Sequence, residues 1–219
     1  MTDSANPLSA AYRFQHLTAF PPDVMRQIEA IYQVSFPPNE RKPFGMVSAA
    51  IQHGHYSVFV VSHDDGAVSK IVAFALMAQL RSSQAMYIEY LAVVPPLREQ
   101  GVGLMLMNSI IAYLKNTPAS AIVWEVDLPQ QAGDDNSRRI RFYERLGAHM
   151  IEQAVQYGMP DYYKGSGILP LRMMWKPLRH DHAQPTKSEL IAFITDIFET
   201  EYPGHASLRD DIIATLDKP

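Results

Sequence analysis

Residues 91–104, LAVVPPLREQGVGL, decide how this chain is expected to fold. The apolar and aromatic run at residues 86–94 stops at two consecutive prolines, which predicts a buried central strand. From Val102 the apolar residues recur at helical spacing as far as Leu114, which predicts an amphipathic helix. We therefore expect a strand, a short turn with two glycines, and a helix that begins at Gly-x-Gly.

The start of this helix is expected to bind an anion. The first turn of a helix leaves amide N–H groups without intrahelical acceptors, and the helix dipole adds partial positive charge there. Gly101 and Gly103 carry no side chains that would keep a phosphate away, and Arg98 adds a guanidinium that can bind two oxygens. A diphosphate is the expected ligand; an ordinary tight turn is the alternative.

Two common diphosphate motifs do not match this turn. A Walker loop requires Gly-Lys-Ser/Thr after the glycines, and a Rossmann fingerprint requires glycine where this chain has Leu106. Residues 98–103, Arg-Glu-Gln-Gly-Val-Gly, resemble motif A of the GCN5-related N-acetyltransferases (GNATs), and residues 91–95 resemble the strand and Val-x-Pro run that precede it. This resemblance implies that acetyl-CoA binds with its pyrophosphate on the amides from Gln100 to Leu104.

A second motif lies at residues 136–148 and predicts a helix that Asn136 caps and Gly147 ends. It resembles motif B of the same family, Asn-x-x-Ala-x-x-Phe-Tyr-Glu-x-Leu-Gly-Phe, and departs from it at Arg139 and Ala148. The first departure could alter contact with the arm of CoA. The residues that the two motifs imply as cofactor contacts are Leu91, Val93, Arg98, Glu99, Gln100, Gly101, Val102, Gly103, Leu104, Asn136 and Tyr143.

Together the two motifs imply an α/β fold of the GNAT type. The expected architecture is a mixed, mostly antiparallel central sheet of six to seven strands flanked by helices, with an added C-terminal helical tail. A hairpin turn is expected at Asp64-Asp65-Gly66. The predicted strands are residues 12–17, 56–62, 71–77, 86–94, 121–128, 150–157 and 171–175. Before the motifs, one helix is predicted to start at Pro21-Pro22-Asp23 and a second to cover residues 46–52.

The chain is predicted to divide after residue 178. Residues 1–178 would form the catalytic domain, and residues 179–219 a linker followed by a helical extension. Thr186-Lys187-Ser188-Glu189 is a capping box in front of an amphipathic pattern, and a shorter helix is expected at residues 207–216. We expect this tail to pack on the domain, with a dimer contact as the alternative.

Acetyl transfer to an amine requires a base, a donor for the tetrahedral oxyanion and an acid for the leaving thiolate. Glu89 is the leading base, because a carboxylate in mid-strand is costly without a partner or a function; a structural pair with arginine or tyrosine is the alternative. Glu125 and Asp127 are reserve candidates that strand alternation places on one face. The resemblance implies that Tyr143 is the acid, or else a core aromatic, and that the backbone N–H of Val93 binds the thioester oxygen.

Two segments lie where the family places the acceptor. One is residues 35–44, and the other is the aromatic segment with Tyr157, Tyr162, Tyr163 and Lys164. Each is equally consistent with an ordinary surface connection.

Composition limits the remaining possibilities. The net charge of −4 argues against a nucleic-acid surface, and the absence of cysteine excludes disulfides, a thiol nucleophile and cysteine-ligated metal sites. His53 with His55 and His180 with His182 lack a third spaced ligand, so no metal is expected. No apolar run reaches membrane-spanning length, and the first residues do not resemble a signal peptide, so we expect a cytoplasmic protein without a membrane partner.

The expected activity is direct transfer of the acetyl group from acetyl-CoA to a primary amine, by a monomer or homodimer. The absence of cysteine supports transfer without a covalent enzyme intermediate. A non-catalytic CoA-binding module and a transferase for longer acyl groups are the alternatives. The acceptor stays open between small molecules and peptides or proteins.

Overall fold

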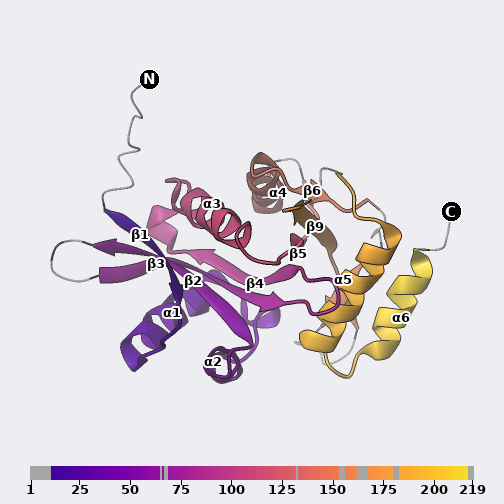
Figure 1. Ribbon diagram of the computed structural model, residues 1–219, viewed down its shortest axis with the longest axis horizontal. Coiled ribbons are helices and arrows are strands. Elements are labelled where there is room, and N and C mark those ends of the chain that lie inside the picture. The colour runs from indigo at the N-terminus through magenta and orange to yellow at the C-terminus, as the bar shows by residue number, and fades with distance from the viewer. Residues whose placement is uncertain are drawn as a thin grey trace. The chain divides into compact units, whose positions relative to one another are not determined.

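The decisive stretch forms the elements that its pattern predicted. Strand β4 (Met86–Val93) leads through the short 3-10 turn η3 (Pro95–Leu97) into helix α3 (Val102–Leu114). Figure 1 shows this arrangement in the computed structural model. The structure describes residues 11–64, 66, 69–131, 133–152, 156–161, 167–179 and 183–216.

The main sheet has seven strands in the order β1-β2-β3-β4-β5-β9-β6, which confirms the predicted α/β fold and strand number. It is mixed: β4 pairs with β5 in parallel, whereas β5 with β9 and β6 with β9 are antiparallel. The chain separates into two compact units. One contains the residues up to Met77 together with Tyr90–Ile110, and the other contains Ala78–Glu89 together with the residues from Ile111 onward. The predicted domain boundary at residue 178 stays a prediction.

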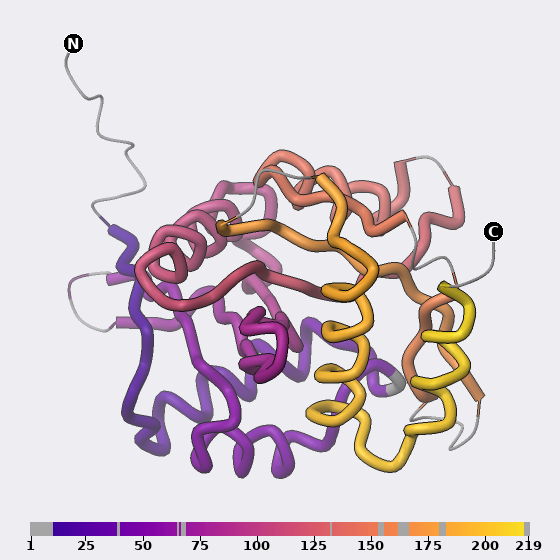
Figure 2. Tube along the Cα trace, turned by 45° about the vertical axis from the view of Figure 1, so that its right-hand side comes forward, coloured from indigo at the N-terminus to yellow at the C-terminus, as the bar shows by residue number. Residues whose placement is uncertain are grey.

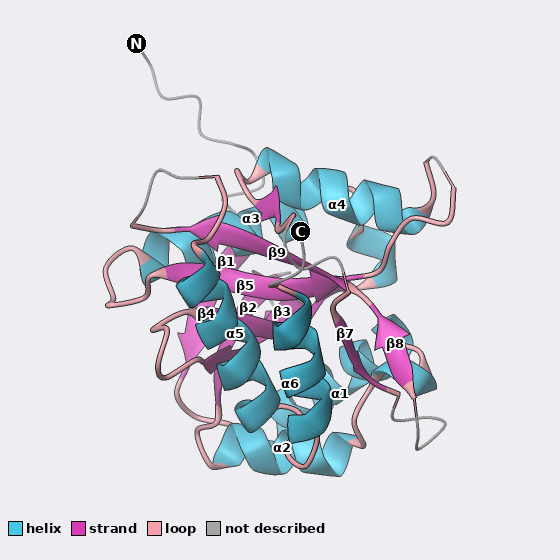
Figure 3. Ribbon diagram, turned by 90° about the vertical axis from the view of Figure 1, so that its right-hand side faces the viewer, coloured by secondary structure: helices cyan, strands magenta, loops and turns pink. Residues whose placement is uncertain are grey.

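The first unit begins with the predicted edge strand. Its elements are β1 (Tyr12–Leu17), α1 (Pro22–Ser35), the 3-10 turn η2 (Pro38–Glu40), α2 (Phe44–Gln52), β2 (Tyr56–Asp64) and most of β3 (Ser69–Gln79). α1 buries the apolar residues that predicted it: Met25, Ile28, Ile31 and Tyr32. Helices α1 and α2 lie on one side of the strands, and the first part of α3 lies on the other (Figures 1 and 3).

Tyr90 of β4 anchors the segment between α1 and α2. Its hydroxyl accepts from the Lys42 amide at 3.2 Å, and its ring packs edge-on against Tyr32 with centroids 4.9 Å apart. The Tyr32 hydroxyl donates to the carbonyl of Lys42 at 2.8 Å. The proline-rich segment is therefore held to the central strand of its own unit.

The second unit contains the later strands and the tail. Its elements are β5 (Ala121–Val126), α4 (Asp135–Arg145), β6 (His149–Met150), β7 (Gly158–Pro160), β8 (Ile168–Pro170), β9 (Arg172–Pro177), α5 (Lys187–Thr200) and α6 (Ala206–Thr215). The predicted capping box is confirmed: the Thr186 side chain accepts from the Glu189 amide, and the Glu189 side chain accepts from the Thr186 amide. α5 and α6 run antiparallel, side by side (Figure 2).

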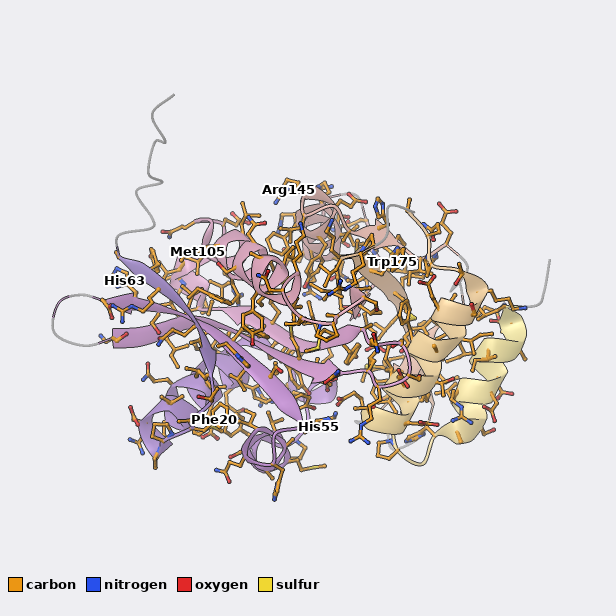
Figure 4. The ribbon with its side chains drawn as sticks, in the orientation of Figure 1. Phe20, His55, His63, Met105, Arg145 and Trp175 are labelled. Carbon is orange, nitrogen blue, oxygen red and sulfur yellow. The ribbon has the colours of Figure 1, made fainter. Side chains whose placement is uncertain are left out.

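Helix α5 is tied to the strands of the second unit by a buried carboxylate. Asp196 accepts from the amides of Ser82 and Ser83, both at 3.0 Å, and from both hydroxyls. Trp175 of β9, labelled in Figure 4, lies 6.3 Å from the Phe193 ring of α5. These contacts supply an acceptor for the amides and hydroxyls of the turn between β3 and β4, and they bury the apolar face of α5.

The prediction for residues 150–157 was wrong in extent. Among the described residues of this range only Met150 belongs to a strand, the two-residue β6, and β7 with β8 forms a separate two-stranded sheet that was not predicted (Figure 3). Ile151 and Tyr157 are buried without belonging to a strand, because single side chains reach the core from irregular backbone. Residues 153–155 and Asp65 of the expected hairpin turn lie outside the described residues.

Candidate active site

The glycine turn, residues 98–104, takes a backbone shape that few side chains tolerate. Gly101 has φ of 86°, in the left-handed region where glycine carries no steric cost, and Glu99 has φ of 62°. Val102 is buried and anchors the first turn of α3, whereas Leu104 is 41% exposed. The predicted strand–turn–helix geometry is therefore present.

This turn leaves a run of amides at the start of α3. In the described part of the chain, the amides of Gln100, Gly101, Val102, Gly103 and Leu104 find no acceptor, and the first to do so is that of Met105, which donates to Gly101 at 2.9 Å. Such groups carry the positive end of the helix dipole. The turn can therefore receive an anionic ligand through backbone donors.

Arg98 holds the turn in place as well as adding charge. Its Nε donates to the carbonyl of Val93 at 3.1 Å, and its Nη2 donates to the hydroxyl of Ser35 at 3.3 Å. The side chain is exposed, so its guanidinium also meets solvent beside the turn. Gln100 donates through Nε2 to the carbonyl of Pro96 at 2.6 Å and tightens the same segment.

In the second unit, strand register sorts the candidate residues onto two faces. Tyr87 pairs with Val123 in the parallel ladder of β4 and β5, so side chains two residues further along share the same face. Glu89 on β4 and Glu125 on β5 are these residues. Trp124 points to the opposite face.

Glu125 is the centre of a carboxylate cluster, which we define as Glu125 with Tyr87, Tyr157 and Tyr202. The hydroxyls of Tyr87 and Tyr202 donate to its Oε2 at 2.8 and 2.7 Å, and the hydroxyl of Tyr157 donates to its Oε1. The three tyrosines are buried. Both oxygens of the carboxylate are therefore held by phenol groups.

Burial sets the electrostatics of this cluster. It raises the pKa of Glu125, against the three hydrogen bonds that act to lower it. Burial, together with the charge of Glu125, also raises the pKa of each of the three tyrosines well above its usual range. The charge of Glu89 adds to the rise in all three pKa values. The phenols are therefore neutral donors at physiological pH.

Asp127, the other reserve base, has a different environment. It lies just after β5 and pairs with Arg139 of α4 at 3.3 Å, with both side chains substantially exposed. The departure from motif B at Arg139 thus supplies a partner for this carboxylate. Glu125 and Asp127 share a strand face by alternation, but the structure does not bring Asp127 into the carboxylate cluster.

Tyr143 lies on the opposite face of β5. Its ring packs on Trp124 with centroids 4.6 Å apart, and its hydroxyl makes no hydrogen bond with the described residues. Burial raises the pKa of Tyr143 to about 12, while the charge of Arg139 acts to lower it. Tyr143 is thus a neutral phenol available as a donor.

The predicted cap of the motif B helix was wrong by two residues. Asp134, not Asn136, is the N-cap, and its carboxylate accepts from the amide of Ser137 at 2.7 Å. This bond and those from Gln130 and Gln131 lower the pKa of Asp134 to about 2. Asn136 instead donates to the carbonyl of Leu128 at 3.3 Å. The predicted stop is confirmed, because Gly147 follows the helix with φ of 73°.

Several candidates fall outside this arrangement. Tyr162, Tyr163, Lys164, His180 and His182 lie outside the described residues. Among the residues that the structure does describe, no group of three His, Asp or Glu side chains is arranged to hold a metal ion. Likewise, no helix in the described ranges is long and apolar enough to span a membrane.

Two members of the carboxylate cluster were not predicted from the sequence. Tyr87 looked like one more apolar residue of a buried strand, and Tyr202 follows α5 in a tail with no motif. Tyr157 was expected only as part of an acceptor loop. No local signal marks these residues, because they lie 38, 77 and 32 positions from Glu125.

Known structures share this architecture. A GNAT-family protein from Bacteroides thetaiotaomicron described as an acetyltransferase aligns over 88% of this chain and 98% of its own, with a TM-score of 0.65 and 24% identity. The ribosomal-protein-S18-alanine N-acetyltransferase of Escherichia coli aligns over 80% of this chain and 99% of its own, with a TM-score of 0.55 and 19% identity. The yncA protein of Salmonella typhimurium, solved with acetyl-CoA, aligns over 80% and 98%, with a TM-score of 0.54 and 20% identity.

Family membership comes from the sequence comparison. A comparison with proteins of curated function found no match. The model of the acetyltransferase (GNAT) family matches residues 25–148, which include the glycine turn, Glu89, Glu125 and Tyr143. The chain therefore belongs to the GNAT family of acetyltransferases, which use an acyl-CoA as donor.

Proposed function

We propose that this protein transfers the acetyl group of acetyl-CoA directly to a primary amine. The observation that carries the proposal is the run of five amides, Gln100 to Leu104, that have no acceptor among the described residues. A pyrophosphate can accept from these amides at the positive end of α3, with the Arg98 guanidinium beside them. The cofactor contacts predicted from the two motifs remain part of this proposal.

We assign the proton-transfer roles to Glu89 and Tyr143. Glu89 is half-buried in mid-strand. This position suits a general base, whose carboxylate must give up hydration water before it accepts a proton from the substrate. Glu125 ranks below Glu89 as the base, because three hydroxyls already occupy its oxygens. Asp127 ranks below both because it is paired with Arg139.

The reaction would proceed through one tetrahedral intermediate. Glu89 takes a proton from the ammonium, and the neutral nitrogen attacks the thioester carbon. The backbone N–H of Val93 stabilises the oxyanion, and collapse of the intermediate breaks the carbon–sulfur bond while the positive nitrogen releases its extra proton to solvent. Tyr143 gives its proton to the leaving thiolate and regains one from solvent, a role that its buried side chain with a neutral phenol supports. No acyl-cysteine intermediate can form, since the chain has no cysteine.

Thiol release from acetyl-CoA over a panel of primary amines tests this proposal. Glu89→Gln should lower turnover roughly 100-fold or more, and Tyr143→Phe should lower it roughly tenfold or more, with acetyl-CoA affinity by calorimetry retained. Glu144→Gln, an exposed change on α4, and Tyr113→Phe, a partly exposed change on α3, are the matched controls.

The outcomes separate the competing functions. Turnover at the wild-type rate in both Glu89→Gln and Tyr143→Phe would contradict these role assignments. Tight acetyl-CoA binding without turnover of any amine would instead favour a non-catalytic CoA-binding module. Faster turnover with a longer acyl-CoA in the same assay would identify a transferase for longer acyl groups.

A further inference from the structure

We propose that the C-terminal tail completes the catalytic machinery: Tyr202, with Tyr87 and Tyr157, is a positioning residue that orients the Glu125 carboxylate on the face that carries Glu89. The inference rests on the proposed function and deepens it. Under this inference, the segment after α5 contributes to the side of the site that receives the amine, which is the strand face that carries Glu89 and Glu125.

The geometry of the carboxylate cluster is that of an oriented anion. Tyr87 and Tyr202 both donate to Oε2 of Glu125, at 2.8 and 2.7 Å, while Tyr157 donates to Oε1. A carboxylate with donors on both oxygens cannot rotate about its terminal torsion without losing bonds. The hydroxyls of Tyr87 and Tyr202 also lie 3.3 Å apart, so they reach the same carboxylate oxygen from adjacent positions.

Anchoring of the tail does not require the Tyr202 hydroxyl. Asp196 already bonds to the Ser82–Ser83 turn, and the Phe198 ring packs edge-on against both Tyr157 and Tyr202. Tyr202→Phe would keep the ring contact with Phe198 and remove the hydroxyl that donates to Glu125. The hydroxyl is therefore separable from the packing of the tail.

The hydrogen-bond partners of Glu125 carry no charge of their own. In the described part of the chain, Glu125 has no lysine or arginine partner, only neutral phenols. An ion pair would cancel the charge, whereas phenols stabilise the carboxylate and leave one negative charge in place. Glu89 on the same face adds to the negative potential.

This potential suits amine acylation. Attack of a neutral amine on the thioester carbon forms a tetrahedral intermediate in which the nitrogen becomes positive and the oxygen negative. A fixed negative charge on the acceptor side lowers the energy of that positive nitrogen until it releases its proton to solvent. Glu125 would then act by its field, and Tyr202 through Glu125.

The titratable groups around Glu125 define a pH test. They are Tyr87 and Glu89 from β4, Tyr157 from the segment before β7, and Glu201 with Tyr202 after α5. The Tyr202 hydrogen bond lowers the pKa of Glu125, so its removal should raise that pKa further. Glu125 would then be protonated to a higher pH.

The first experiment compares Tyr202→Phe with Tyr113→Phe in the full chain. Carbon-13 NMR of the side-chain carboxyls, with Glu125→Gln for assignment, follows the titration of Glu125 without any need for turnover. We expect the midpoint to move to higher pH in Tyr202→Phe and to stay in Tyr113→Phe. An unchanged midpoint in Tyr202→Phe would overturn the inference.

The second experiment measures the pH profile of thiol release with acetyl-CoA and the best amine of the panel. Tyr202→Phe should lower kcat about tenfold on the acidic side and shift that limb to higher pH, with KM for acetyl-CoA unchanged. In the Glu125→Gln background the same change should have no further effect on kcat. Equal losses in both backgrounds would show that Tyr202 does not act through Glu125.

The two readouts separate failure of the inference from failure of the proposed function. A shifted titration without wild-type turnover on any amine would refute the proposed function and, with it, the catalytic role of Tyr202. Turnover with an unshifted titration would refute the positioning role alone.

Discussion

The glycine turn and the carboxylate cluster are built in opposite ways. The turn consists of seven consecutive residues, 98–104, and presents backbone N–H groups. The cluster brings together side chains from four separate segments of the second unit, at positions 87, 125, 157 and 202. One is a local conformation of the chain, and the other exists only when distant segments meet.

Because of this difference, substitutions in the glycine turn and in the carboxylate cluster should have different consequences. The donors of the turn belong to the backbone, so a substitution changes them only by changing φ and ψ. The donors of the cluster are buried side chains, so loss of their acceptor leaves them unsatisfied. The turn should therefore fail first in ligand binding, and the cluster first in stability.

Removal of the shared acceptor should produce the largest effect. Glu125→Ala would leave three buried tyrosine hydroxyls without their acceptor, and the free energy of unfolding should fall by about 3 kcal/mol. Urea unfolding measures this change. Asp127→Ala, which breaks an exposed pair, is the control and should cost less than about 1 kcal/mol. Equal losses of unfolding free energy in the two variants would show that the carboxylate cluster stabilises the protein no more than an exposed ion pair does.

A change of backbone shape should come next. Gly101→Ala places a side chain at φ of 86°, which costs about 1–2 kcal/mol, and should weaken acetyl-CoA binding about tenfold as the amides turn away. Isothermal titration calorimetry gives the affinity. Gly54→Ala, at φ of 73° after α2 in the same unit, is matched for strain and should leave the affinity unchanged. A comparable loss in Gly54→Ala would mean that strain, not the position of the amides, governs binding.

The pH dependence of stability should show the smallest effect. Burial raises the pKa of Glu125 above its unfolded value of 4.5, so the folded protein binds that proton more tightly than the unfolded chain does. The resulting stability is fully present below the unfolded pKa and is lost as pH rises through the folded pKa.

Glu125→Gln removes this titration. The unfolding free energy of the wild type should therefore fall relative to that of the variant as pH rises from 4 to 8, in urea melts at each pH. A wild-type free energy that instead rises relative to the variant would mean that the hydrogen bonds outweigh burial and lower the pKa.

The predictable parts of the fold were those with strong local chemistry. The α1 pattern of Met25, Ile28, Ile31 and Tyr32 and the capping box at Thr186 both specify a helix within a few residues. The motif B helix shows where this fails. Asp134, Asp135 and Asn136 are adjacent residues that can all cap, and the approach of the loop, through the bonds of Gln130 and Gln131 to Asp134, selects the first.

Local sequence was sufficient to predict the strand–turn–helix unit and the glycine turn, because backbone donors at a helix start depend on near neighbours. Strand alternation also placed Glu125 and Asp127 on one face. Only the tertiary structure decided that Glu125 is enclosed by Tyr87, Tyr157 and Tyr202 while Asp127 pairs with Arg139. Hydrogen bonds between side chains far apart in sequence depend on how the chain packs, and no short pattern of residues encodes that.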